Sequence, residues 1–181
     1  MSKILIGLAI ALLDFELQFA GGRALDLTPD VLGYILVFLG IREIGKYSLK
    51  FSTAYKLACF AAIAAGIVFV TKLVIGEINM STVIILLGIA ELVLQVLLMY
   101  FLAAGLQDME NDFAISLQSK WLKIISFCII PGILLGYAGL LLASLKTIGY
   151  LIVDIGCYAY LFLFILAREA YKEWLIDVNE E

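Results

Sequence analysis

The 181-residue sequence contains no histidine, three cysteines and only two prolines. Without histidine, the chain has no ligand for histidine-bound haem and no imidazole to act as a general acid or base. Cys59, Cys128 and Cys157 lie singly in apolar stretches without CxxC spacing, which argues against a thiolate metal site or a disulfide framework. The motifs GxSxG and HExxH are also missing. We therefore predict no metal site, no cofactor and no enzymatic activity.

Charged residues are scarce too, at 15% of the chain, whereas 64% of the residues are hydrophobic. The mean hydropathy is +1.09. Soluble domains contain only about 45–50% apolar residues, so the composition predicts an integral membrane protein whose first partner is the lipid bilayer. The net charge of −4 excludes nucleic acid as an expected partner, because binding a phosphate backbone requires clustered lysine and arginine.

The apolar residues occur in six blocks, most of them close to the roughly 20 residues that a helix needs to cross the hydrocarbon core. The sequence thus predicts an all-α polytopic membrane protein, a compact bundle of six transmembrane helices in a single domain. Pro131 is expected to kink the fifth of them. The predicted helices cover residues 3–20, 30–45, 55–75, 81–105, 121–145 and 147–167, followed by an acidic amphipathic tail at 168–181.

The first block is the weakest, because Asp14, Glu16 and Gln18 interrupt it after about ten residues. Either the helix continues to about Phe19 with these polar residues facing protein, or the alternating DFELQF stretch becomes extended. The Gly21–Gly22 doublet and the later Pro29 favour a break. We predict that residues 14–29 are not one regular helix, so that the first extracellular connection is partly non-helical.

Positive charge in the connections predicts the orientation, since cytoplasmic loops are enriched in lysine and arginine. With six spans, nine such residues fall on one side of the membrane and three on the other. We therefore expect the N and C termini in the cytoplasm. The nine are Lys3, Arg42, Lys46, Lys50, Lys56, Lys120, Lys123, Arg168 and Lys172, and the three are Arg23, Lys72 and Lys146.

Small and polar residues share single faces of four predicted helices, as is typical where helices meet around a site. An ionisable side chain near the bilayer centre costs about 2.5–3.5 kcal/mol even on insertion scales, so its presence indicates a role. Together these stripes predict an acidic, aromatic, outward-facing pocket for a cation, a protonated amine or protons. The candidate ligand-binding residues are Asp14, Glu16, Asp30, Tyr34, Glu91, Gln95, Tyr150, Asp154 and Tyr158.

A structural role competes with this interpretation at several positions. Asp30 follows Pro29 at a helix start, where a carboxylate caps the helix, and this role is favoured for it. Glu16 fits the membrane interface. Glu91 and Asp154 lie deeper in their helices, where an acid must be paired, protonated or liganded, and a functional role is favoured for both.

The cytoplasmic side offers an alternative function. In the tail, Tyr171, Trp174, Leu175 and Val178 follow helical spacing, which predicts either an interfacial continuation of the last helix or a docking helix for a partner. Through this tail and the loop at 106–120, the chain would serve as a non-catalytic scaffold or accessory subunit. The small-residue stripe that includes Gly132 and Gly136 is interpreted as internal packing, with a homodimer face as the second possibility.

The segment LLDFELQFAGGRALDLTPDVLGYILVFLGI resembles one found in small multi-pass membrane proteins of clostridia and related bacteria. The resemblance covers about the first 45 residues and implies a bacterial cytoplasmic membrane, without implying an activity. Six spans in a chain of this length are also similar, in size and topology alone, to the substrate-binding subunits of energy-coupling-factor transporters. The matching residues of the first resemblance are Asp14, Pro29, Asp30, Gly33 and Tyr34.

Overall fold

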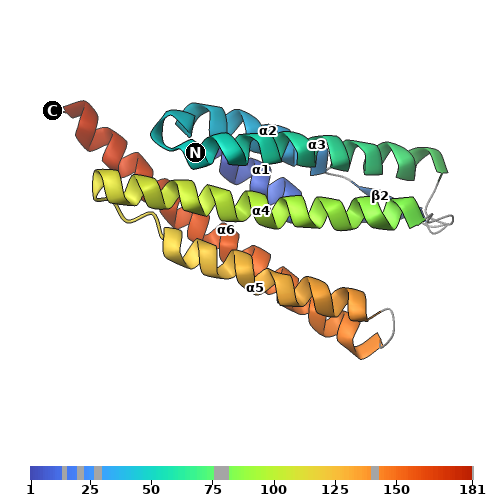
Figure 1. The fold of residues 1–181 in the computed structure, drawn as a ribbon. Helices are drawn as coiled ribbons and strands as arrows, with labels where there is room; N and C mark the ends of the chain where they lie inside the picture. The colour runs from blue at the N-terminus through green and yellow to red at the C-terminus, as the bar shows by residue number, and fades with distance from the viewer. Residues whose placement is uncertain (14–15, 20–22, 27–29, 76–81, 140–142, 181) are drawn as a thin grey trace.

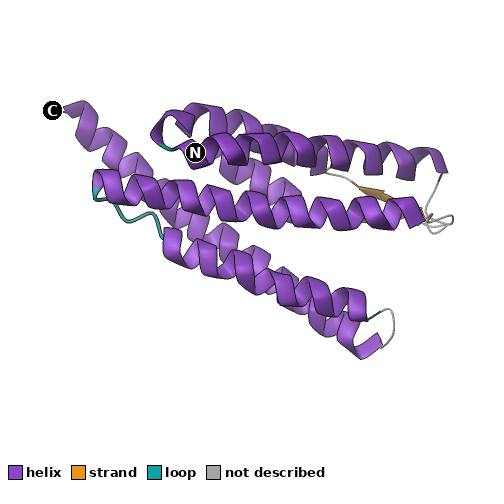
Figure 2. Cartoon of the chain, viewed as in Figure 1, coloured by secondary structure: helices purple, strands orange, loops and turns teal. Residues whose placement is uncertain are grey.

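The computed structural model describes residues 1–13, 16–19, 23–26, 30–75, 82–139 and 143–180. Most of these residues are helical, as expected (Figures 1 and 2). Two strands follow α1, and a short 3-10 turn, η1 (Gly45–Tyr47), joins α2 to α3. The helices are α1 (Ser2–Leu12), α2 (Asp30–Ile44), α3 (Leu49–Ile75), α4 (Thr82–Phe113), α5 (Ser119–Ala138) and α6 (Ala143–Glu180).

Four of these helices are long and apolar enough to cross a membrane, which makes the chain a multi-pass membrane protein. The segments concerned are Leu49–Thr71, Leu86–Phe113, Ser119–Ala138 and Ser144–Val178. The remaining two, α1 with 11 residues and α2 with 15, are shorter.

The first predicted helix, 3–20, is too long, because α1 ends at Leu12. Two antiparallel strands follow, β1 (Glu16–Phe19) and β2 (Arg23–Asp26), with Glu16 opposite Asp26 and Phe19 opposite Arg23. Alternation of polar and apolar residues suits an extended chain better than a helix. The prediction that residues 14–29 do not form one regular helix is therefore confirmed by its described part.

The ends of other helices also differ from the predicted ones. The fourth helix continues to Phe113, well into the predicted loop 106–120, and α5 ends at Ala138 instead of residue 145. The sixth begins at Ala143 and runs without a break to Glu180, so the predicted tail is the last part of α6. Charged residues did not end α4 or α6, because charged side chains continue a helix readily once it leaves the apolar layer.

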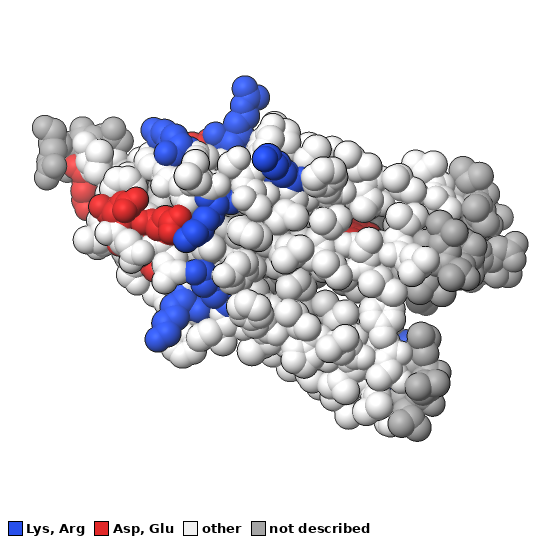
Figure 3. Space-filling view, viewed as in Figure 1, with Lys and Arg blue, Asp and Glu red and all other residues white. Residues whose placement is uncertain are grey.

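The helices form a closed ring. Each packs against the next along the chain, and α6 also packs against α1. Figure 3 shows that charged side chains gather at the end of the bundle that holds η1 and the start of α5, which we call the charged end. The opposite end, which holds the strands and the start of α6, is the hairpin end. Both chain termini lie toward the charged end (Figure 1).

Glycines bring two neighbouring helix pairs into close backbone contact. A Cβ placed on Gly7 of α1 would lie 2.5 Å from the carbonyl oxygen of Gly33 on α2, and one placed on Gly149 of α6 would lie 2.7 Å from that of Gly132 on α5. Only glycine permits backbones to approach this closely. The stripe with Gly132 and Gly136 thus packs inside the chain, against α6.

Candidate functional site

A cavity of about 250 Å³ lies inside the ring of helices. It receives residues from every helix except α3, and Figure 3 shows a notch at the hairpin end where the surface parts into two lobes. The lining residues are Ala11 and Leu12 of α1, Asp30 of α2, Leu92, Gln95, Val96 and Met99 of α4, Ile129 and Ile133 of α5, and Tyr150, Val153, Asp154 and Cys157 of α6.

Four of the predicted ligand-binding residues line this cavity: Asp30, Gln95, Tyr150 and Asp154. They come from three helices that are far apart in sequence. On α6 the lining positions follow i, i+3, i+4 and i+7, which is one face of a helix, and on α4 they do the same. The helical stripes seen in the sequence therefore face one another at these positions.

The side chain of Gln95 joins α4 to the end of α1. Its Nε2 donates a hydrogen bond to the carbonyl oxygen of Ala11, over 3.2 Å. Because α1 stops at Leu12, its last carbonyl groups have no partner within the helix. The C-terminus of a helix carries about half a negative charge from the aligned peptide dipoles. This end of α1 adds negative potential to the wall of the cavity.

Tyr34 and Glu91 lie beside the cavity without lining it. Tyr34 is 1% exposed, and the carboxylates of Glu91 and Asp30 lie near its hydroxyl group. Glu91 is half-buried and precedes Gln95 by one helical turn. Glu91, expected in the common pocket, is not among the residues that line the cavity.

Asp154 is an exposed residue where the cavity meets the surface. It makes no hydrogen bond or ion pair with any other residue that the structure describes, and Cys157 lies about one turn further along α6. One turn in the other direction, the ring of Tyr150 lies under the ammonium group of Lys146, with 5.6 Å from Nζ to the ring centroid. A carboxylate and an aromatic ring thus stand side by side on α6.

Three predicted site residues are not brought to the cavity by the described structure. Tyr158 is 62% exposed and does not line it, because residues eight apart on a helix differ by about 80° in direction. The predicted stripe from Tyr150 to Tyr158 drifts off the cavity face for this reason. Asp14 lies outside the described residues, and the structure describes only the backbone of Glu16.

Sequence reasoning missed Cys157, which is 6% exposed and lines the cavity. Its position three residues after Asp154, on the same helix face, was the available signal. No group of three potential metal ligands occurs among the described His, Cys, Asp and Glu residues.

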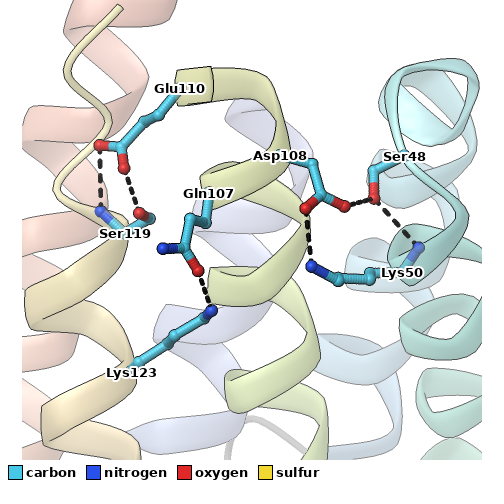
Figure 4. Close-up of polar contacts among 7 residues, drawn as sticks. All are labelled: Ser48, Lys50, Gln107, Asp108, Glu110, Ser119 and Lys123. Atoms are coloured by element: carbon cyan, nitrogen blue, oxygen red, sulfur yellow. Dashed lines mark hydrogen bonds and ion pairs between the residues drawn. The ribbon is translucent and has the colours of Figure 1, made fainter. Parts of the chain in front are cut away.

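The charged end has a different character, because its polar side chains bind one another (Figure 4). Asp108 of α4 accepts hydrogen bonds from Ser48 Oγ at 2.5 Å and Lys50 Nζ at 2.6 Å, both at the start of α3. Glu110 accepts hydrogen bonds from the backbone N–H of Leu117 and Ser119, before and at the start of α5. Carboxylates at the end of α4 therefore hold the starts of both neighbouring helices.

Aromatic side chains add to this end. Trp174 of α6 contacts Tyr47 and Phe113, with ring centroids 6.0 and 4.8 Å apart. Tyr171 is 8% exposed and also contacts Trp174, whereas Val178 is 51% exposed. The apolar face predicted for the tail is therefore largely covered by η1 and the end of α4.

No protein-family model, curated protein or solved structure matches this chain.

Proposed function

We propose that this protein binds a small cation or protonated amine within a bacterial cytoplasmic membrane, as a solute-binding or transport protein. The observation that carries the proposal is the cavity, whose described lining includes Asp30 and Asp154 but no lysine or arginine. The C-terminal end of α1 supplies further negative potential. In transporters, interrupted helices with carbonyl groups at a site near the membrane centre coordinate cations in the same way.

Asp154 is the carboxylate that we assign to the solute. Asp30 stands in the first turn of α2, where a negative charge stabilises the positive end of the helix dipole. Part of its charge therefore serves the fold. Asp154 lies about three turns after the start of α6, away from either helix end, so a bound cation would relieve the cost of placing its charge within the membrane.

Six crossings, with both termini in the cytoplasm, fit this proposal. The 11 residues of α1 cover about 16 Å and the four of β1 about 13 Å, which together match the roughly 30 Å hydrocarbon core. Strand β2 and α2 would together make the second crossing, in the opposite direction. The non-helical stretch is then within the membrane, where such backbone must be buried in protein or line a hydrated cavity. The charged end would face the cytoplasm.

A scaffold function is the second candidate, and the structure disfavours the surface it would use. Tyr171 and Trp174 pack against the chain itself, so they are not available to a partner unless the charged end opens. Gln95 of α4 and Asp154 of α6 also line a cavity, which supports a binding function over a purely structural one.

The test is cation-dependent thermal stability of the purified full-length protein in detergent. Methylammonium at ten times its Kd should raise Tm by about 3 °C over the same ionic strength of N-methyl-D-glucamine, a cation too large for the cavity. Asp154→Asn should abolish this shift. The matched control is Asp177→Asn, at an exposed position near the end of α6. An Asp154→Asn protein that responds like the unmodified one would overturn the proposal.

Cysteine labelling in intact cells tests the six crossings. In a background that lacks the native cysteines, single cysteines at positions 23, 77 and 146 should react with an impermeant reagent, and one at position 46 should react only after lysis. Reaction at 46 in intact cells would show that the orientation is wrong.

A further inference from the structure

The cavity is divided into a polar and an apolar part. Asp30 opens α2 and Tyr150 lies near the start of α6, so both stand toward the hairpin end. Along α4 and α6 the lining becomes apolar in the direction of the charged end, where Met99, Ile129 and Cys157 are 1%, 3% and 6% exposed. Below them the fully buried Tyr160 donates its hydroxyl hydrogen to the carbonyl oxygen of Met99 at 2.7 Å, so this group is already satisfied.

We infer that the solute is an amphipathic organic monocation, a primary amine with a one-ring or branched alkyl body. Its ammonium group binds Asp154 beside the ring of Tyr150, and its apolar body lies against Met99, Ile129 and Ile133. This inference rests on the proposed function and specifies its substrate class.

A bare inorganic cation fits the cavity less well. Water molecules that would accompany the ion need two to four polar partners each, and the apolar part of the cavity offers none among its described side chains. A divalent ion would need about six oxygen ligands arranged around one point, whereas no three of the described Asp, Glu and Cys residues lie close enough together to hold a metal ion. An apolar group fills the same space without losing hydrogen bonds.

The size of the cavity limits the apolar body. A cavity of about 150 Å³ lined by aliphatic side chains is enough to bind benzene. The present volume of about 250 Å³ therefore suits a single ring together with an aminomethyl group. The ring of Tyr150 already accepts a cation, Lys146, on its face, which shows that it is placed for a cation–π contact.

The probes are benzylamine, methylamine, sodium ion and the neutral isostere benzyl alcohol, measured by calorimetry and thermal shift on the full-length protein in detergent at pH 7. Benzylamine should bind at least about tenfold tighter than methylamine, because its ring is removed from water. Benzyl alcohol should bind at least about tenfold more weakly than benzylamine, since it lacks the charge.

Two pairs of variants separate the head group from the body. Asp154→Asn should abolish binding of both amines, and Asp177→Asn should leave it unchanged. Ile133→Phe fills the cavity and should weaken benzylamine at least about tenfold while methylamine still binds. Its control, Ile130→Phe, adds the same ring at a position that is 37% exposed and away from the lining.

The outcomes distinguish a failure of the inferred substrate class from a failure of the proposed function. If methylamine or sodium binds as tightly as benzylamine and this depends on Asp154, the substrate class is wrong and the proposed function stands. If benzyl alcohol matches benzylamine, or no probe binds, both fail. Should Asp154→Asn not fold, the comparison of benzylamine with benzyl alcohol and the Ile133 and Ile130 variants still decide the question.

Discussion

The two halves of α4 are equally apolar in sequence but differently packed. Residues 98–109 contain Leu98, Met99, Leu102, Leu106 and Met109, all at most 1% exposed, whereas none of the described side chains at 86–97 is buried. The first half of the helix supplies three of its four cavity-lining residues, and the second half extends to the charged end. Hydrophobicity therefore does not determine where this bundle packs tightly.

The two ends differ in their ties, by which we mean the hydrogen bonds and ion pairs that join one helix to another. At the charged end, Asp108 and Glu110 hold the starts of α3 and α5, and Lys3 of α1 pairs with Glu43 of α2 at 2.5 Å. Toward the hairpin end, the hydrogen bond from Gln95 of α4 to Ala11 of α1 is a polar contact between helices, and glycines bring the backbones together within the pairs α1–α2 and α5–α6. A bundle fixed at one end and paired at the other leaves room between the pairs, which is where the cavity lies.

The largest loss of stability is expected from a side chain that forces α5 and α6 apart. Gly149→Val would place side-chain atoms against the backbone of α5 and should destabilise the protein by about 3 kcal/mol. The matched control is Gly88→Val on α4, because a Cβ at Gly88 meets no atom within 4 Å. Thermal unfolding of the two variants measures the difference. Equal loss in both would mean that α5 and α6 are not held by this contact.

The rate at which a thiol reagent modifies Cys157 in the cavity should depend on the charge of the reagent. In a protein with Cys59→Ser and Cys128→Ser, the cationic thiol reagent 2-aminoethyl methanethiosulfonate should modify Cys157 at least about tenfold faster than its anionic sulfonatoethyl counterpart, after correction for their reactivity with a free thiol. Asp154→Asn should reduce this preference, and Asp177→Asn should not. Equal rates for both reagents would show that the cavity has no negative potential. Mass spectrometry of the intact protein follows the reaction.

A smaller loss of stability is expected from removing an ion pair at the charged end. Asp108→Asn removes the ion pair with Lys50. The side chain of Lys50 is 43% exposed and that of Asp108 is 30% exposed, so solvent already weakens this ion pair. The loss should be about 1 kcal/mol. Asp154→Asn should leave stability unchanged or raise it, because that carboxylate has no described ion-pair partner. A larger loss at position 154 than at position 108 would reverse the comparison between the two ends.

The smallest effect is expected at the entrance to the cavity. Lys146 lies over Tyr150 and competes with a solute for the same ring, so Lys146→Gln should tighten benzylamine binding by about threefold, as one weak cation–π contact allows. Calorimetry checks this value. The control is Lys120→Gln, an exposed lysine in the first turn of α5. Weaker binding in the Lys146 variant would show that this lysine assists the solute instead.

The sequence predicted the helical membrane bundle, because length and hydropathy are local properties, and the glycine doublet with the alternating run indicated the break after α1. It also indicated the polar stripes that reach the cavity through Gln95 and Asp154. It did not predict that Tyr158 would leave the common face, since that depends on how α6 is rotated against its neighbours. The ties through Asp108 and Glu110 were missed because their partners are set by helix crossing, and a charged loop has no pattern that reveals them.

The contact between the first and last helices has a consequence for biosynthesis. Arg168 Nε donates a hydrogen bond to Ser2 Oγ at 3.0 Å, and α6 packs along α1. During translation α1 leaves the ribosome first, whereas α6, which packs against it, is the last helix to be made. The face of α1 that packs against α6 therefore has no partner until the end of translation, when α6 arrives and closes the ring.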